Sequence, residues 1–295
     1  MNYYNEIKTE IINNEITKKV KDYSKNRSDL NTYYNVGKLL SEAGKHYGEG
    51  IIKEYSKRLT CEFGKGYGVS NLKNMRNFYI MCLKSQTLSD QLTWSHYCEL
   101  LSIDSINKIN YYIKITKEQN LSVRELRSRI KNNEYERLDD KTKEKLKENK
   151  INNEVTDYIK NPILINNKNN YNEISEKMLQ KIILEDIESF LKELGESFCF
   201  VESEYKIKIG DRYNYIDLLL FNYEFNCFVV VELKVTELKK EHIGQIEVYM
   251  NYIDNNLRKA TQDKTIGIII CKKDNKFIIE YASDKRILSR EYEFI

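Results

Sequence analysis

The 295-residue chain lacks any run of eighteen consecutive apolar residues, so none of its helices is expected to cross a membrane. Its N-terminus, MNYYNEIKTEII, lacks a basic segment followed by an apolar one, and no signal peptide is expected. We therefore expect a cytoplasmic protein. Its length and its 41% content of hydrophobic residues are enough for one large or two ordinary domains with a sizeable core.

Cysteine pairs of the CxxC type are also absent, although the chain has six cysteines. Structural zinc sites usually depend on such close pairs, so these cysteines do not predict zinc binding. Most of them lie within apolar stretches, and we interpret them as buried free thiols in a reducing compartment. His46 and His242 likewise have no metal-ligating neighbours in the sequence.

Charge is distributed unevenly along the chain. Residues 1–150 contain 28 lysines and arginines against 20 acidic residues, whereas residues 151–295 contain 20 against 25. A basic first half would attract nucleic acid, and an acidic second half would hold cations. The alternative is compositional drift, because abundant Lys, Asn, Ile and Tyr with a single proline resemble an AT-rich coding bias.

Residues 1–130 have the apolar periodicity of helices, with Gly44 and Gly64 as expected ends of two of them. We expect helices at 36–43, 51–63, 70–83, 92–103, 106–116 and 122–132. The charged, apolar-poor stretch that follows predicts an exposed linker over residues 131–160, helical in part. The expected domains are therefore residues 1–130 and residues 161–295.

The turn KGYG, between two of these helices, resembles that of a helix-turn-helix. The polar face of its second helix offers side chains suited to phosphates or base edges: Asn71, Lys73, Asn74, Arg76 and Asn77. Arg124, Arg127 and Arg129 on a later helix are further candidates for phosphate contacts. In both places the alternative is a solvated helix face with no binding role.

The second domain changes from helical to strand-like periodicity after an amphipathic helix, which we expect from Ser175 to about Leu194, before Gly195. A second helix is expected at about 239–254. Strands are expected at SFCFVESEYKIKIG, YNYIDLLLF, CFVVVELKV, IGIIICKK and FIIEYA. The fold class is therefore α+β overall, a helical N-terminal domain followed by an α/β domain with a mixed sheet.

Two of these strands carry ionisable residues in otherwise apolar runs, Asp217 in YIDLLLF and Glu232 with Lys234 in VVVELKV. The short connection between them predicts an antiparallel hairpin. If Phe221 pairs with Phe228, Asp217 lies opposite Glu232, and a register one residue tighter places it opposite Val231. Glu232 and Lys234 are two residues apart and share one face of the sheet.

Burying two carboxylates and an ammonium in apolar strands costs free energy unless the groups are paired or bind a metal ion. A divalent cation would relieve the repulsion between Asp217 and Glu232, and Mg²⁺ suits oxygen ligands and leaves room for a phosphate. Lys234 would then orient or deprotonate the attacking water and stabilise developing negative charge. The alternative is a structural salt bridge between Lys234 and one carboxylate.

These motifs, in their order along the chain, resemble the PD-(D/E)XK nuclease superfamily, and more narrowly its YhcG-type bacterial members. The resemblance extends over about residues 28–282 and rests on QLTWSHYCELL, NLSVRELRSRI, FLKELGESFCFV, YIDLLLF, VVVELKV and GQIEVYMNYID. It implies a restriction-endonuclease-like C-terminal domain. It also implies an endonuclease that hydrolyses phosphodiester bonds, with DNA as the favoured substrate and Mg²⁺ or Mn²⁺ as cofactor.

By this resemblance Asp217, Glu232 and Lys234 match the catalytic motif, with Asp217 and Glu232 as metal ligands, and Gln245 and Tyr249 match residues of the following helix. Gln245 would contact a phosphate, a base or water, and Tyr249 is expected to pack. The family also implies an N-terminal domain that binds DNA or a protein partner, a homodimer, and a role in DNA defence or repair.

One position departs from the family pattern. Gln180 stands where a glutamate often occurs on the first helix of the domain, with Glu176 and Glu185 as neighbouring substitutes. An amide offers an oxygen ligand but no charge. The alternative function is therefore a nucleic-acid-binding adaptor with a catalytically weak nuclease core.

Overall fold

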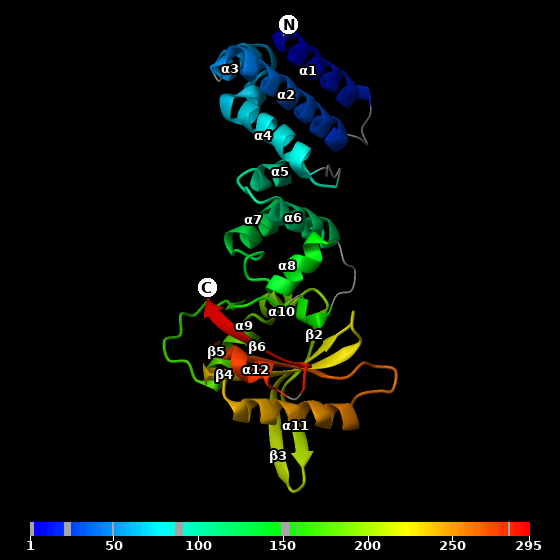
Figure 1. Ribbon diagram of the computed structural model, residues 1–295, viewed down its shortest axis with the longest axis vertical. Coiled ribbons are helices and arrows are strands. Elements are labelled where there is room, and N and C mark those ends of the chain that lie inside the picture. Colours follow the sequence, from blue (N-terminus) through cyan, green and yellow to red (C-terminus); the bar gives the residue numbers. More distant parts are fainter. Residues whose placement is uncertain are drawn as a thin grey trace. The chain divides into compact units, whose positions relative to one another are not determined.

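The computed structural model describes residues 3–20, 25–48, 50–85, 91–148, 154–157, 159–282 and 284–295. The chain divides into two compact units, unit 1 at 1–135 and unit 2 at 136–295, whose elements are labelled in Figure 1. Within the described ranges, no helix combines the length and the apolar character that crossing a membrane requires. The domain limits expected from the sequence, 130 and 161, stay predictions.

Unit 1 is helical, as the sequence predicts. Its elements are α1 (Tyr3–Val20), α2 (Lys25–Tyr47), α3 (Ile51–Phe63), η1 (Lys65–Tyr67), α4 (Val69–Ser85), α5 (Trp94–Leu100), α6 (Ile106–Glu118) and α7 (Val123–Lys131). Apolar side chains of the first four helices form a shared core, among them Ile7, Val36, Ile52 and Leu72.

Helices α2 and α4 approach closely at Gly37. A Cβ atom there would lie 2.1 Å from the backbone oxygen of Met75, so only glycine allows this contact. Gly64 ends α3 as expected, and its N–H donates to the carbonyl oxygen of Thr60. Gly44 does not end α2, which continues to Tyr47, because a helix tolerates one glycine when tertiary packing holds its flanks.

Unit 2 is built around a six-stranded mixed sheet in the order β1-β6-β5-β4-β3-β2. Strand β3 pairs antiparallel with both β2 and β4. The β4–β5, β5–β6 and β6–β1 pairs are parallel. The strands are β1 (Ile163–Ile165), β2 (Phe198–Ile209), β3 (Arg212–Asn222), β4 (Cys227–Glu237), β5 (Ile266–Lys273) and β6 (Ile287–Phe294).

Helices cover both faces of this sheet. The helices of unit 2 that pack on the sheet are α9 (Glu176–Glu185), α10 (Ile187–Leu194), α11 (Lys240–Asn256) and α12 (Lys276–Glu280), and the unit also contains α8 (Asp140–Lys147) and η2 (Val155–Asp157). One core joins α9 and α10 to residues such as Leu218 and Val231, and a second joins α11 to residues such as Leu219 and Val230. Neighbouring strand residues enter different cores because side chains alternate between the faces.

Two expectations for unit 2 were wrong. The segment FIIEYA forms helix α12 and a turn rather than a strand, with Phe277 and Tyr281 largely exposed. Because β5 and β6 are parallel, the chain between them must cross back, so a strand directly after β5 could not occupy that place. The single helix expected from Ser175 to Leu194 is divided at Asp186, whose carboxylate accepts a hydrogen bond from Asn166.

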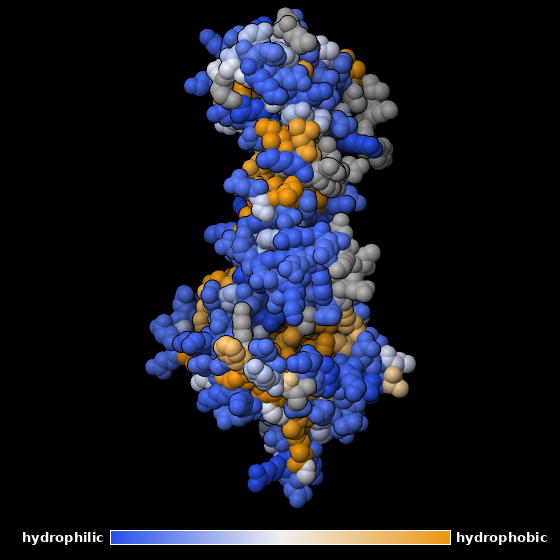
Figure 2. Space-filling model, in the orientation of Figure 1, coloured by the Kyte–Doolittle hydropathy of each residue, from blue (hydrophilic) through white to orange (hydrophobic). Residues whose placement is uncertain are grey.

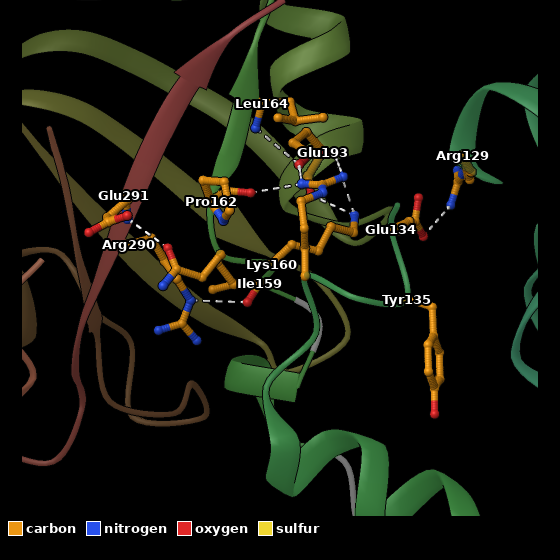
Figure 3. Close-up of polar contacts among 12 residues, drawn as sticks. Arg129, Glu134, Tyr135, Ile159, Lys160, Pro162, Leu164, Glu193, Arg290 and Glu291 are labelled. Atoms are coloured by element: carbon orange, nitrogen blue, oxygen red, sulfur yellow. Dashed lines mark hydrogen bonds and ion pairs between the residues drawn. The ribbon is translucent and has the colours of Figure 1, made fainter. Parts of the chain in front are cut away.

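The segment that precedes β1 is fastened to unit 2 by polar contacts (Figure 3). Arg137 forms an ion pair with the half-buried Glu193 and donates to the carbonyl oxygen of Pro162 at 2.8 Å. Lys160 donates to the carbonyl oxygen of Glu193 at 2.7 Å, and Arg290 donates to that of Ile159 at 3.0 Å. The described parts of 136–160 are therefore part of the folded unit.

Candidate functional site

The register of the β3–β4 hairpin is the first of the two considered. Phe221 pairs with Phe228, and the pairing continues to Leu218 and Val231. The next step would pair Asp217 with Glu232, but instead the Asp217 carboxylate accepts a hydrogen bond from the backbone N–H of Leu233, at 2.7 Å. At the point where the two strands separate, a hydrogen bond to a side chain thus takes the place of a backbone–backbone hydrogen bond. This bond holds one carboxylate oxygen of Asp217 in a fixed position.

Glu232 and Lys234 lie on the same face of β4, as their spacing predicts. The Lys234 Nζ donates to Glu232 Oε1 at 2.8 Å, and both residues are buried, at 2% and 8% exposure. The second carboxylate oxygen of Glu232 is also buried and has no hydrogen-bond partner. An unpartnered buried carboxylate oxygen costs free energy, and a cation beside this atom would lower that cost.

Burial and mutual repulsion shift the pKa values of the two carboxyl groups. Burial, together with the charge of Asp217, raises the pKa of Glu232 to about 7 against the opposing effect of Lys234. Burial also raises the pKa of Asp217, although the Leu233 N–H and Lys234 act against it. For Lys234 burial alone would lower the pKa, but its contacts with Glu232 outweigh burial and raise it. Lys234 is therefore an ammonium at neutral pH.

The first helix of the domain, α9, places Glu176 beside these residues. Ser175 caps the helix by accepting from the N–H of Met178, and the Glu176 carboxylate lies 3.4 Å from Lys234 Nζ. Gln180 is buried and donates to the backbone carbonyl of Asp217 at 2.8 Å. Gln180 thus orients β3, and of the acidic neighbours on α9 it is Glu176 that reaches the site.

Glu185 lies elsewhere, where its carboxylate accepts hydrogen bonds from Tyr171 and Asn169. It is therefore no substitute for an acidic residue at the site.

Helix α11 contributes a buried tyrosine. The Gln245 side chain donates to the hydroxyl oxygen of Tyr249 at 3.1 Å. Burial raises the pKa of Tyr249, the hydrogen bond from Gln245 lowers it, and the charges of Glu232 and Asp217 raise it further. Gln245 is thus connected to the site through Tyr249.

Glu204 on β2 is a neighbour that sequence reasoning missed. The pairing of β2 with β3 continues on both sides of it, which makes Asp217 the residue opposite, and its negative charge adds to the effects that raise the pKa of Asp217. Its φ of 51° is rare for a residue with a side chain. A glutamate within an alternating strand gives no local signal of this kind.

Comparison with protein families decides the identity of this arrangement. Residues 156–294 match the YhcG PDDEXK nuclease domain, and residues 6–137 match the DUF1016 N-terminal domain. Residues 156–294 therefore form a domain of the YhcG-type PDDEXK nuclease family. Asp217, Glu232 and Lys234 lie within the range that matches the nuclease domain.

Among relatives of this PDDEXK family, the chain is similar to YhcG of Escherichia coli (strain K12), with 26% identity over 308 residues, 89% of this chain and 82% of that one. A repair endonuclease from Pyrococcus abyssi is a weak structural match, with TM-score 0.30, 16% identity, and coverage of 42% of this chain and 48% of that one. The structure of an EndoMS–dsDNA2 complex matches with TM-score 0.29, 19% identity, and coverage of 43% and 48%. In both cases the match spans about half of the solved chain.

The residues of this PDDEXK site fit a divalent cation. Asp217 and Glu232 offer hard oxygen ligands, and the unpartnered Glu232 oxygen and the raised carboxyl pKa values are both features that a cation would relieve. Among the described residues, no group of three or more histidine, cysteine or acidic side chains is arranged to hold a metal. Two protein ligands are consistent with Mg²⁺, which usually keeps several waters.

The candidate nucleic-acid contacts on α4 differ in exposure. Lys73 is exposed, whereas Arg76 is only half-exposed. Asn74 is half-exposed as well, and its side-chain amide donates to the sulfur of Cys98 at 3.9 Å. Lys73 is thus the side chain of the three that is most open to a ligand.

The candidates on α7 are partly engaged within unit 1. Arg124 is exposed, but Arg127 forms two hydrogen bonds with the carboxylate of Glu99, at 2.7 and 3.0 Å. Arg129 forms an ion pair with Glu134. A phosphate would have to displace Glu99 to bind Arg127.

Proposed function

We propose that the protein is a metal-dependent endonuclease that hydrolyses phosphodiester bonds in DNA. The observation that carries this proposal is the meeting of Asp217, Glu232 and Lys234 at the β3–β4 separation, in a PDDEXK domain. A purely structural salt bridge between Lys234 and Glu232 would not require a second buried carboxylate, that of Asp217, whose charge raises the pKa of Glu232.

Asp217 and Glu232 would hold the Mg²⁺ or Mn²⁺ ion. The bound ion would polarise the scissile phosphate and lower the pKa of a water. Lys234, charged at neutral pH, would donate to the attacking water or to a phosphate oxygen and stabilise the negative charge that develops there.

Other residues would keep these groups in place. The Leu233 N–H fixes one oxygen of Asp217, and Gln180 fixes its backbone. Gln245 would act through Tyr249, which closes the site on the α11 side. We assign Gln180 a positioning role, so its lack of charge does not weaken the proposed metal site, because Glu176 supplies the nearby acidic group.

Unit 1 is proposed to bind DNA or a protein partner, with Lys73, Asn74, Arg76, Arg124 and Arg127 as the candidate DNA contacts. A homodimer would allow both strands to be cut.

The test compares cleavage of linear, circular and branched DNA with Mg²⁺ or Mn²⁺ by the intact protein, Asp217→Ala and Lys234→Ala. Each variant is expected to lose at least a hundredfold in rate, on the order found when one stabilising group is removed from an active site. Glu293→Gln and Lys259→Gln, at exposed positions, serve as charge-matched controls and should cut normally. EDTA should stop cleavage by the intact protein.

If the intact protein cuts nothing while it and both variants bind DNA alike, the adaptor function replaces the nuclease proposal. Cleavage that persists in both variants would show that the activity comes from another site or a contaminant.

A further inference from the structure

The β2–β3 hairpin extends beyond the body of the sheet and projects past α11 (Figure 1). Its pairing runs without interruption from Tyr205 and Ile216 to Ile209 and Arg212. Gly210, with φ of 60°, makes the two-residue turn at the tip possible. An isolated two-stranded hairpin is only marginally stable in water, so a projecting one of this kind suggests a binding role.

The two faces of the hairpin differ. Ile207 and Ile216 are buried in the core that includes α11. On the opposite face, Lys206 pairs across the strands with Tyr215, and Lys208 pairs with Tyr213. All four of these side chains are exposed, and we call them the Lys–Tyr face.

The Lys–Tyr face holds its charges in a fixed pattern. The ammonium of Lys206 lies 3.9 Å from the ring centre of Tyr213, a cation–π contact, and that of Lys208 lies 6.0 Å from it. The Tyr215 ring is 53% exposed. The tip adds Arg212, with Asp211 as the one acidic residue of the segment 205–215, and the end of the hairpin is hydrophilic in Figure 2.

We propose that the Lys–Tyr face binds a single-stranded stretch of the nucleic acid that the nuclease site cuts, an inference that rests on the proposed function for its link to cleavage. Exposed lysines suit phosphates, and exposed tyrosine rings suit unstacked bases, since every base has a face that can stack. A duplex keeps its bases stacked on one another, so it offers the exposed tyrosine rings of this face no free base to stack on.

The position of this face relative to Asp217 supports the assignment. Tyr215 precedes Asp217 by two residues on β3, a rise of roughly 7 Å along the strand. Between the base of the hairpin and α9 lies an open pocket of about 570 Å³, lined by Ser203 and Glu204 on one side and by Lys177 and Lys181 on the other. A strand bound on the Lys–Tyr face would therefore reach the carboxylate site, with further lysines beside its path.

The experiment measures binding of fluorescent single-stranded and duplex oligonucleotides to the full chain in EDTA, across a salt series. Lys206→Gln/Lys208→Gln should lower the slope of log affinity against log salt by about 1.4, because two phosphate contacts are lost. Tyr215→Ala should weaken single-strand binding about tenfold, and Tyr215→Phe should restore it, since stacking needs the ring and not the hydroxyl.

Matched controls lie at the other end of β3. Lys259→Gln/Lys264→Gln removes the same charge from exposed lysines, and Tyr223→Ala removes a ring that is 60% exposed. The proposal is overturned if the hairpin variants lose no more affinity than these controls, or if duplex binding falls as much as single-strand binding. Binding in EDTA is measured separately from cleavage. A protein that shows these binding losses but cuts no DNA in the cleavage experiment would contradict the nuclease proposal and leave the binding proposal standing.

Discussion

At the scale of single residues, the burial of the Asp217 carboxylate costs folding stability. This carboxylate is partly buried beside Glu232, and burial raises its pKa. A raised pKa means that the folded state disfavours the charged form relative to the unfolded state. We therefore expect Asp217→Asn to abolish cleavage and yet to raise the free energy of unfolding of unit 2 in EDTA at pH 8, by roughly 1 kcal/mol.

The sign of the pH dependence distinguishes this effect from a change in packing. With a raised folded-state pKa, the contribution of Asp217 is most favourable below its ordinary pKa and is lost as pH rises through the raised value. Denaturant unfolding of the intact protein and of Asp217→Asn should therefore agree best at low pH and diverge as pH rises. Added Mg²⁺ should stabilise the intact protein more than the variant. A variant less stable than the intact protein at pH 8 would contradict this account.

Also at the residue scale, the sequence was sufficient to predict that Asp217, Glu232 and Lys234 lie together, but not what surrounds them. Asp217, Glu232 and Lys234 are conspicuous because ionisable groups interrupt apolar strands, and hairpin geometry then fixes their relation. Glu204 gave no such signal, since acidic residues at exposed positions are common, and Glu176 was named only as one of two substitutes for an acidic residue at Gln180. Their proximity to Asp217 and Lys234 depends on tertiary packing.

At the scale of secondary-structure elements, the contact between α2 and α4 depends on the absence of a side chain at Gly37. Gly37→Ala would place a methyl group 2.1 Å from the Met75 carbonyl oxygen, and the helices would have to separate. We expect a loss of about 2 kcal/mol in the stability of unit 1, typical of overpacking. Gly244→Ala is the control, because that helical glycine has no atom near the added methyl and should stabilise by about 1 kcal/mol.

Thermal unfolding followed by circular dichroism measures both changes. Equal effects of the two substitutions would show that helix propensity, and not the α2–α4 contact, decides the outcome.

Elements were predictable where a local rule determines them. Ser175 caps α9 and Gly195 follows α10, both as the sequence indicates. The strand β6 was missed because its segment, ILSREYEF, mixes charged and apolar residues, and α12 was taken for a strand because FIIEYA is short and apolar. Which of the two segments forms a strand is decided by the parallel pairing of β6 with β5. This is a long-range contact that no local sequence pattern records.

At the scale of the whole molecule, the limits of unit 2 decide which fragment will fold. A fragment starting at residue 161, the limit expected from charge pattern, would lack Arg137 and Lys160 and leave Glu193 without these two cationic partners. A fragment of residues 136–295 keeps both. Removing one side of a buried ion pair typically costs about 3–5 kcal/mol. We therefore expect residues 136–295 to unfold cooperatively and to retain metal-dependent cleavage, and residues 161–295 to be several kcal/mol less stable.

Glu193→Gln, made in the shorter fragment, provides the internal control, because it removes the charge that the missing segment neutralises. It should restore part of the lost stability there and should destabilise residues 136–295, where it breaks the pair with Arg137. Urea unfolding of the four proteins measures this interaction directly. Equal stability of the two fragments would mean that the segment before β1 is dispensable, and the contacts of Arg137 and Lys160 would then be incidental to the fold of the nuclease domain.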